Sequence, residues 1–139
     1  MHGNDVFEYA IVRVVPRVER EEFLNVGIIL HCAMQEFLRM KSALDERRLR
    51  SLHGDVNIEE IKAHLKMFEQ VCDGSASAGP IATLPAGERF RWLTAPRSTI
   101  VQTSPVHTGL CGDARTTLDH LVAALVMRED PKGGDLRPG

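Results

Sequence analysis

The most constraining feature of this sequence is the stretch from Phe7 to Cys32, which contains two runs rich in β-branched residues. Pro16 and a cluster of charged residues separate the runs, and this pattern predicts two strands joined by a polar connection. Both faces of the first run, 7–15, are mostly apolar, which is typical of a central strand that is covered at least partly on both sides. We therefore expect the fold to be built around this pair of strands.

The second run, 24–32, alternates in a way that separates two faces. The expected core face holds Leu24, Val26, Ile28, Leu30 and Cys32, and the other face holds Asn25, Gly27, Ile29 and His31. A glycine inside a strand indicates a β-bulge, a close approach by another group, or a simple contact between small residues. The sequence leaves these three alternatives for Gly27 open.

Helical signals follow a third predicted strand at 36–41. Asp45 is placed to cap a short helix over 46–52, and Asn57 with Glu60 forms a capping-box pattern at the start of a longer helix. Apolar residues recur at helical spacing along this second helix. They are Ile58, Ile61, Leu65, Phe68 and Cys72.

In the second half of the chain, loops separate the predicted helices and strands. Residues 73–87 are rich in glycine, serine, alanine and proline and predict a surface connection, followed by a helical turn at 88–93. A fourth strand is predicted at 98–103, and a loop then leads to Asp113, which is placed to cap a last helix. The apolar face of that helix is Leu118, Leu121, Val122, Leu125 and Val126.

This order of elements predicts an α+β fold. Three consecutive strands with short links favour an antiparallel sheet of about four strands, and we expect the helices to pack on one face of it as a two-layer sandwich. We expect residues 1–127 to form a single domain and residues 128–139, which combine proline, glycine and charge, to form a disordered tail.

Composition narrows the function classes. The 139 residues have a formal net charge of −2, which argues against a strongly basic nucleic-acid binder. The three cysteines, Cys32, Cys72 and Cys111, form no Cys-x-x-Cys pair, so neither a disulfide framework nor a zinc ribbon is indicated. There is no secretory signal and no membrane-length apolar run. We expect a soluble cytoplasmic protein without a bound metal or cofactor.

Several polar residues are candidates for binding a ligand. Arg13 lies within an apolar strand face and needs either a carboxylate from the charged cluster that follows or a ligand. Arginines and hydroxyl groups at 89–99 suit a phosphate or carboxylate, although they also suit a solvated helix end. His107 is a candidate general base or hydrogen-bond donor, although bonding within its own loop explains it as well. The ligand-binding candidates are Arg13, Asn25, Arg91, Arg97, Ser98, Thr99 and His107.

The densest basic patch lies between the third strand and the first helix. It consists of Arg39, Lys41, Arg47, Arg48 and Arg50. Asp45 and Glu46 interrupt it and it contains no stacking aromatic residues, which disfavours nucleic-acid binding. A solvated face or a docking face for an acidic partner are the better interpretations.

Two segments carry a resemblance to a known family. YAIVRVVPRVEREEFLNVGIIL and RFRWLTAPRSTIVQTSPVHTG resemble small bacterial proteins grouped as domain of unknown function three-zero-three-seven, and the similarity covers about Phe7 to Met127. Members of that family are often encoded beside a HipA-like kinase, so the resemblance implies a companion, regulatory or antitoxin-like subunit of such a kinase.

Three functional hypotheses follow. No complete catalytic constellation is visible in the sequence, so the first is a non-enzymatic interaction partner that docks through a sheet edge or the basic patch. The second is a small enzyme or sensor that binds an anionic ligand through Arg13, Arg91, Arg97 and His107. The third is nucleic-acid binding through Arg39–Arg50.

Overall fold

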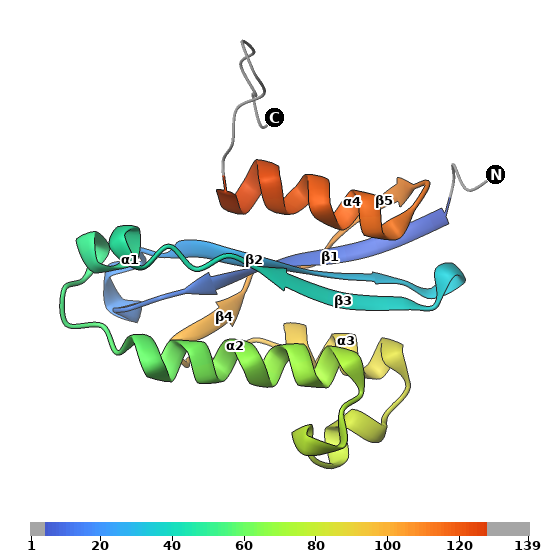
Figure 1. The fold of residues 1–139 in the computed structure, drawn as a ribbon, viewed down its shortest axis with the longest axis horizontal. Helices are drawn as coiled ribbons and strands as arrows, with labels where there is room; N and C mark the ends of the chain where they lie inside the picture. The colour runs from blue at the N-terminus through green and yellow to red at the C-terminus, as the bar shows by residue number, and fades with distance from the viewer. Residues whose placement is uncertain (1–4, 128–139) are drawn as a thin grey trace, which may run out of the picture.

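The computed structural model of the chain describes residues 5–127, and its centre is an antiparallel sheet of five strands (Figure 1). The strands are β1 (Asp5–Val14), β2 (Leu24–Cys32), β3 (Phe37–Ser42), β4 (Val101–Thr103) and β5 (His107–Cys111). Their order is β3-β2-β1-β4, and β5 pairs with the first half of β1 beside β4. The predicted C-terminal tail at 128–139 lies outside the described residues.

Four α-helices surround the sheet. They are α1 (Glu46–Leu52), α2 (Ile58–Asp73), α3 (Ala86–Thr94) and α4 (Ala114–Leu121), and α4 continues as the π-helical segment η5 (Val122–Met127). Short 3₁₀ turns complete the chain at η1 (Val18–Arg20), η2 (Ala33–Gln35), η3 (Ala76–Ala78) and η4 (Pro80–Thr83). The predicted caps are confirmed, because the side chains of Asp45, Asn57 and Asp113 each accept a hydrogen bond from a backbone amide three residues on.

The helices lie on both faces of the sheet and so make three layers. Figure 1 shows α4 over one face, with α2 and α3 over the other. The α+β class and the antiparallel sheet are confirmed, but the expected two-layer sandwich with helices on one face is corrected. The physical reason is that β1 and β2 carry apolar residues on both faces, so each face needs a cover.

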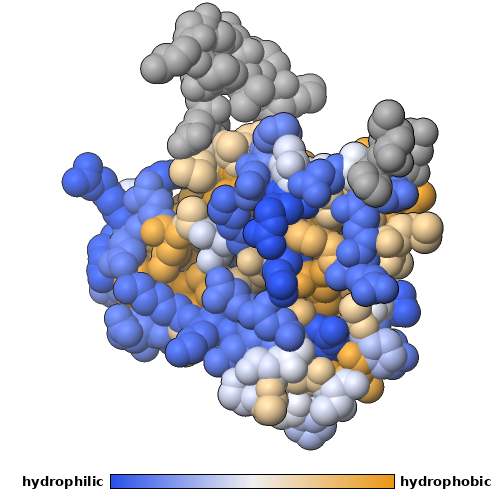
Figure 2. Space-filling view, turned by 45° about the vertical axis from the view of Figure 1, so that its right-hand side comes forward, coloured by the Kyte–Doolittle hydropathy of each residue, from blue (hydrophilic) through white to orange (hydrophobic). Residues whose placement is uncertain are grey.

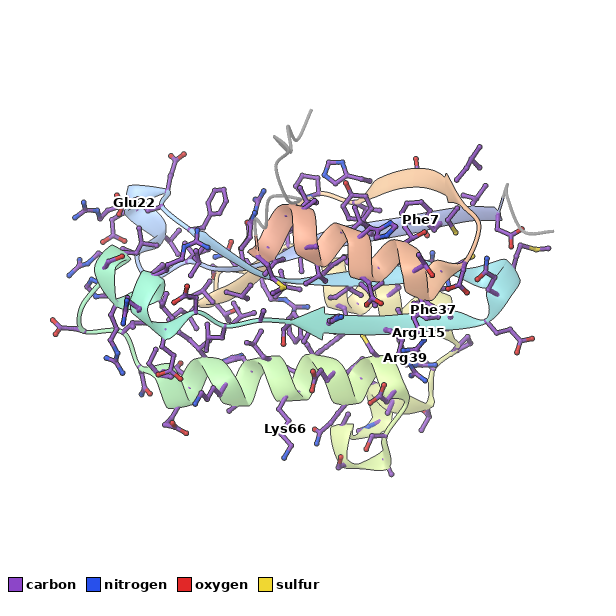
Figure 3. All side chains as sticks on the ribbon, turned by 45° about the horizontal axis from the view of Figure 1, so that its top comes forward. Phe7, Glu22, Phe37, Arg39, Lys66 and Arg115 are labelled. Carbon is purple, nitrogen blue, oxygen red and sulfur yellow. The ribbon has the colours of Figure 1, made fainter. Side chains whose placement is uncertain are left out.

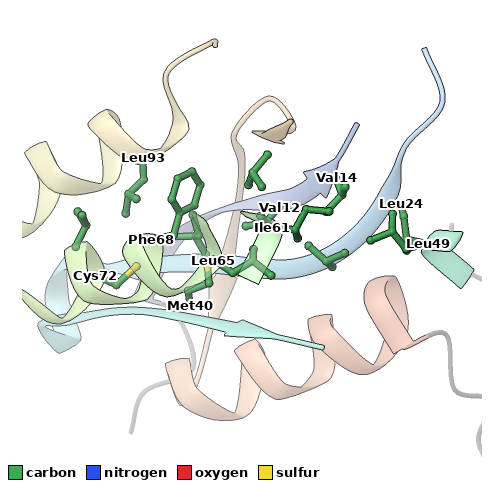
Figure 4. Close-up of a cluster of buried hydrophobic side chains, with 14 of the residues drawn as sticks. Val12, Val14, Leu24, Met40, Leu49, Ile61, Leu65, Phe68, Cys72 and Leu93 are labelled. Atoms are coloured by element: carbon green, nitrogen blue, oxygen red, sulfur yellow. The ribbon is translucent and has the colours of Figure 1, made fainter. Parts of the chain in front are cut away.

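Each face has its own core. Against α2 and α3, the buried side chains include Val12, Ile29, Phe68, Phe90 and Leu93, and Figure 4 shows several members of this cluster. Against α4 and η5, the buried side chains are Phe7, Ile28, Leu30, Cys32, Cys111, Ala114, Leu118, Val122 and Val126. The predicted apolar stripe of α2 is fully buried. Among the described residues, no helix is long and apolar enough to cross a membrane.

The strand β5 was predicted as a loop, and this is a second correction. It pairs with β1 from Asp5↔Cys111 to Tyr9↔His107. Pro105 and Gly109 weaken the strand pattern, and only pairing with β1 makes this segment extended. Ser104 joins β4 to β5, since its amide donates to the Ile11 carbonyl and its Oγ accepts from the Ile11 amide at 2.9 Å.

A β-bulge lies at Gly27. Val12 pairs with Gly27 while Arg13 pairs with Asn25, which leaves Val26 as the extra residue. A Cβ atom on Gly27 would also lie 3.0 Å from the Lys41 carbonyl oxygen, so two of the alternatives for this glycine are realised together. The bulge moves Leu24 and Val26 to the core under α2 and turns Asn25 toward η5.

Candidate functional site

The first candidate site is the outer edge of β5, where apolar side chains reach the surface. Val6 and Leu110 are cross-strand partners, and their exposed fractions are 58% and 63%. Directly paired residues share one face of a sheet. Phe7, the chain neighbour of Val6, belongs to the core under α4, so Val6 and its partner Leu110 point to the opposite face, where their exposure shows that α2 and α3 leave them uncovered. Figure 2 shows hydrophobic surface among hydrophilic side chains at this end of the molecule.

The two edges of the sheet differ in how they are protected. On β3, Lys41 Nζ lies 2.8 Å from Asp119 of α4, and Arg39 Nη1 lies 3.0 Å from Asp73 of α2. Figure 3 shows Arg39 at this edge with Arg115 of α4 nearby. The strand β5 contains no Asp, Glu, Lys or Arg, and no other described strand pairs with its outer edge. Charged side chains discourage a sheet edge from adding a strand, so β5 is the edge that accepts one more readily.

The second candidate site lies at the other end of β1, beside the bulge. Asn25 Nδ2 donates to the Leu125 carbonyl oxygen at 3.1 Å, which satisfies one of the last carbonyls of η5. Asn25 Oδ1 is buried and has no hydrogen-bond partner among the described residues, and the same holds for Arg13 Nε. Arg13 and Asn25 are directly opposite each other on β1 and β2. Two buried polar atoms without a partner at one place are unusual in a folded protein, which makes this place a candidate for ligand binding.

The Arg13 guanidinium lies over the Phe23 ring, with its Cζ 4.1 Å from the ring centroid. The predicted ion pair with the charged cluster is not formed, since no described carboxylate makes an ion pair with Arg13. Burial lowers the pKa of Arg13 from its ordinary value, because a cation is less stable away from water. Arg13 is therefore a partly desolvated cation that is held by an aromatic face.

A pocket of about 440 Å³ opens beside Asn25. It is lined by Leu24, Asn25, Ala43, Leu44, Asp45, Glu46, Arg48, Val126 and Met127. An adjoining pocket of about 180 Å³ shares four of these residues and adds Phe23 and Leu125. We call the two together the bulge pocket. Its lining combines apolar side chains with a few polar groups, as small-molecule sites do.

The other ligand-binding candidates lie elsewhere. Arg97 stacks on Trp92 and Phe68, and its Nη2 donates to the Trp92 carbonyl at 2.6 Å, on the α2 side of the sheet. Burial lowers the pKa of Arg97. Arg91 is exposed on α3, and His107 stacks on Tyr9 with ring centroids 5.1 Å apart. The structure does not bring Arg13, Arg91, Arg97 and His107 into one pocket.

The two hydroxyl candidates are also apart from Arg13. Thr99 Oγ1 donates to the Val101 carbonyl at 2.8 Å. Ser98 lines a shallow hollow beside η1, together with Pro16 and His53. Of the seven predicted ligand residues, only Arg13 and Asn25 lie directly opposite each other, as cross-strand partners. Two residues that were not predicted as ligand residues lie beside them: Phe23, under the Arg13 guanidinium, and Arg48, which lines the same pocket as Asn25. Phe23 was missed because an exposed aromatic after a charged cluster has no periodicity to mark it.

The predicted basic patch divides into two parts. Arg39 and Lys41 lie on β3 and form the ion pairs with α2 and α4 described above. Arg47 and Arg50 are exposed on α1. Arg48 is half-buried and lines the bulge pocket. The patch is therefore not one continuous surface.

The cysteines are buried thiols and form no disulfide. Burial raises the pKa of Cys72 to about 12, and burial followed by the neighbouring Cys32 thiol raises that of Cys111. Within residues 5–127, no group of three or more His, Cys, Asp and Glu side chains is arranged to hold a metal ion.

Comparison with known proteins gives one match. The family model described as "Protein of unknown function (DUF3037)" matches residues 9–126, which is most of the chain. The chain belongs to the DUF3037 family. Searches of curated proteins and of solved structures found no match. The family segment includes β2 with its bulge, α1, η5 and β5, so both candidate sites lie almost entirely within it.

Proposed function

We propose that this DUF3037 protein is a non-enzymatic interaction module that binds an extended segment of a partner protein along the outer edge of β5. The observation that carries the proposal is the exposed pair of Val6 on β1 and Leu110 on β5, because β5 is an edge strand that has no charged side chain. A partner strand that pairs with β5 would satisfy backbone groups at the edge, and an apolar partner side chain would cover this pair.

The first partner to test is a HipA-like kinase. The family resemblance supports this choice, because the genes of such kinases often lie beside those of the family. In this proposal the chain is a companion or antitoxin-like subunit. The edge of β5 supplies the contact, and the exposed arginines Arg47 and Arg50 on α1 supply the alternative docking face.

Leu110→Lys tests the proposed edge. A lysine next to a docked strand places a charge in an apolar contact, so we expect the affinity for the kinase to fall at least about tenfold, equivalent to roughly 1.4 kcal/mol. Val18→Lys is the matched control, because Val18 is 49% exposed on η1, away from β5. Binding is measured by calorimetry, and circular dichroism checks that both variants fold.

Hydrogen exchange locates the contact. In the complex we expect the amides of 107–111 that point away from β1 to gain protection, because an added strand would bond to them. If Leu110→Lys binds as the wild type does while Arg47→Glu with Arg50→Glu does not, the basic face carries the docking and the edge proposal is wrong. Absence of any binding would remove the kinase as the partner, and self-association that Leu110→Lys abolishes would assign the edge to a second copy.

A further inference from the structure

We propose that the bulge pocket binds a small organic carboxylate with an apolar chain. Its acid group would meet Arg48, with the cation of Arg13 on the Phe23 ring as a second positive charge next to the pocket, and its chain would lie against Leu24, Leu44 and Val126. This site is separate from the β5 edge. Val6 and Arg13 are seven residues apart on one strand, which is about 23 Å at the usual rise of a strand.

The charges in the pocket favour an anion. Two carboxylates line it. The charge of Glu46 is paired, since its Oε2 lies 3.1 Å from Lys62 Nζ, whereas Asp45 accepts the Arg48 amide at 3.1 Å and keeps its negative charge. No carboxylate in the described part of the chain makes an ion pair with the guanidinium of Arg48. Arg48 lines the pocket, and Arg13 lies over the ring of Phe23, which lines its adjoining part. These two half-buried cations outnumber the one unpaired carboxylate, Asp45, and an arginine suits a carboxylate ligand through paired hydrogen bonds.

The rest of the lining favours an apolar chain on that anion. Leu24 and Val126 are core residues at the pocket wall, and Leu44 packs against the α2-side core. Met127 is 47% exposed at the pocket. A free phosphate would meet the arginines and leave these apolar surfaces in water. A chain that covers them gains from their burial.

The local backbone explains why the pocket is present. The extra residue at the bulge turns Asn25 toward η5. There Nδ2 donates to the Leu125 carbonyl, while Oδ1 accepts no hydrogen bond from any described residue. Bulges and π-helical segments are both enriched at functional sites, and here one of each faces the other across the pocket. A hydroxyl or amide group on the ligand would satisfy Oδ1.

Three probes separate charge from apolar contact. Sodium hexanoate carries both features, 1-hexanol only the chain, and inorganic phosphate only the charge. We expect methyl NMR spectra of the full chain to shift with hexanoate at Leu24, Leu44 and Val126, and to shift much less with either of the other probes. Equal binding of hexanol would show an apolar cavity without anion recognition, and equal binding of phosphate would show a cation cluster only. Either result would overturn the proposal.

Arg48→Met and Arg47→Met form the variant pair. They are neighbours on α1, and only Arg48 lines the pocket. Methionine keeps the apolar stem and removes the charge, so Arg48→Met should weaken hexanoate at least about tenfold, while Arg47→Met should leave its affinity within about twofold. Arg13→Met should also weaken it. If Arg48→Met and Arg47→Met bind hexanoate equally, the carboxylate is not held at this pocket and the assignment is wrong. The Leu110→Lys variant should bind hexanoate as the wild type does, so this test is independent of the β5 edge.

Discussion

Gln35 connects three parts of the chain, and its removal is the sharpest test of the packing around β5. Its side chain lies in the 3₁₀ turn between β2 and β3. Nε2 donates to Asp5 Oδ2 at 2.9 Å and to the Gly112 carbonyl, and Oε1 accepts from the Ala114 amide at 2.9 Å. One side chain therefore joins the start of β1, the end of β5 and the first turn of α4.

The expected cost of Gln35→Ala follows from these bonds. A typical intramolecular hydrogen bond contributes about 1 kcal/mol, and a bond to a charged group contributes more. The Ala114 amide belongs to a fully buried residue, so its donor would be left unsatisfied. We expect the free energy of unfolding to fall by about 3 kcal/mol, which lowers the urea midpoint by roughly 2 M at a slope of about 1.5 kcal/mol per molar.

Gln102→Ala is the matched control for this measurement. Gln102 makes one exposed hydrogen bond, from Nε2 to the Thr99 carbonyl at 2.9 Å, three residues away in the chain. Its removal should cost no more than about 0.5 kcal/mol. If urea unfolding shows that the two variants lose the same free energy within about 0.5 kcal/mol, the three-way connection through Gln35 does not stabilise the fold and this reasoning is refuted.

Two further predictions concern single buried positions. Gly27→Ala should lower the free energy of unfolding by about 1–3 kcal/mol, because the new Cβ meets the Lys41 carbonyl oxygen at 3.0 Å; a stabilised variant in urea unfolding would contradict this. The thiol of Cys72 should stay protonated in the folded chain while the unfolded thiol ionises near its ordinary pKa of 9.0, since burial raises the folded value to about 12. The free energy of unfolding is therefore unaffected by this thiol below pH 9.0. Between pH 9.0 and 12 it falls by about 1.4 kcal/mol per pH unit, because only the unfolded thiol loses its proton there. Urea unfolding at about pH 8 and about pH 10 should show a smaller decline for Cys72→Val than for the wild type, and equal declines would count against the raised pKa.

The local elements follow closely from the sequence. The caps at Asp45, Asn57 and Asp113 and the apolar stripe of α2 are local patterns, and the structure confirms them. These signals are readable because a helix forms its hydrogen bonds within one segment, so spacing along the chain reports directly on its faces. The extended pair β1 and β2 is readable for a similar reason, since β-branched residues favour strands.

The arrangement of the layers was only partly readable. The apolar residues on both faces of β1 indicated cover on both sides, yet the order of the elements, with three linked strands first and the helices mostly after them, favoured one covered face. The position of α4 across the sheet from α2 depends on a chain path of about 40 residues between them, with β4 and β5 in between. Nothing in the local pattern of either helix specifies that path.

The candidate sites depended even more on tertiary structure. Arg13 and Asn25 were recognised as polar residues in strands, but a one-residue shift decides which face each occupies. Strict alternation put Asn25 on the same face as Ile29, whereas the bulge at Gly27 puts it toward η5. The position of Arg13 opposite Asn25 and over Phe23, and the pocket that Phe23, Asn25 and Arg48 line, therefore followed from register and packing.

By itself, the sequence determined the class of the fold, the central pair of strands and the ends of the main helices. These features depend on hydrogen bonds and apolar spacing between residues that are close together in the chain. Only the tertiary structure decided that β5 is an edge strand whose Leu110 forms an exposed pair with Val6 of β1, and that a pocket beside Arg48 opens at the bulge. Both depend on which residues far apart in the chain face each other, and strand pairing sets this only when the whole sheet is assembled.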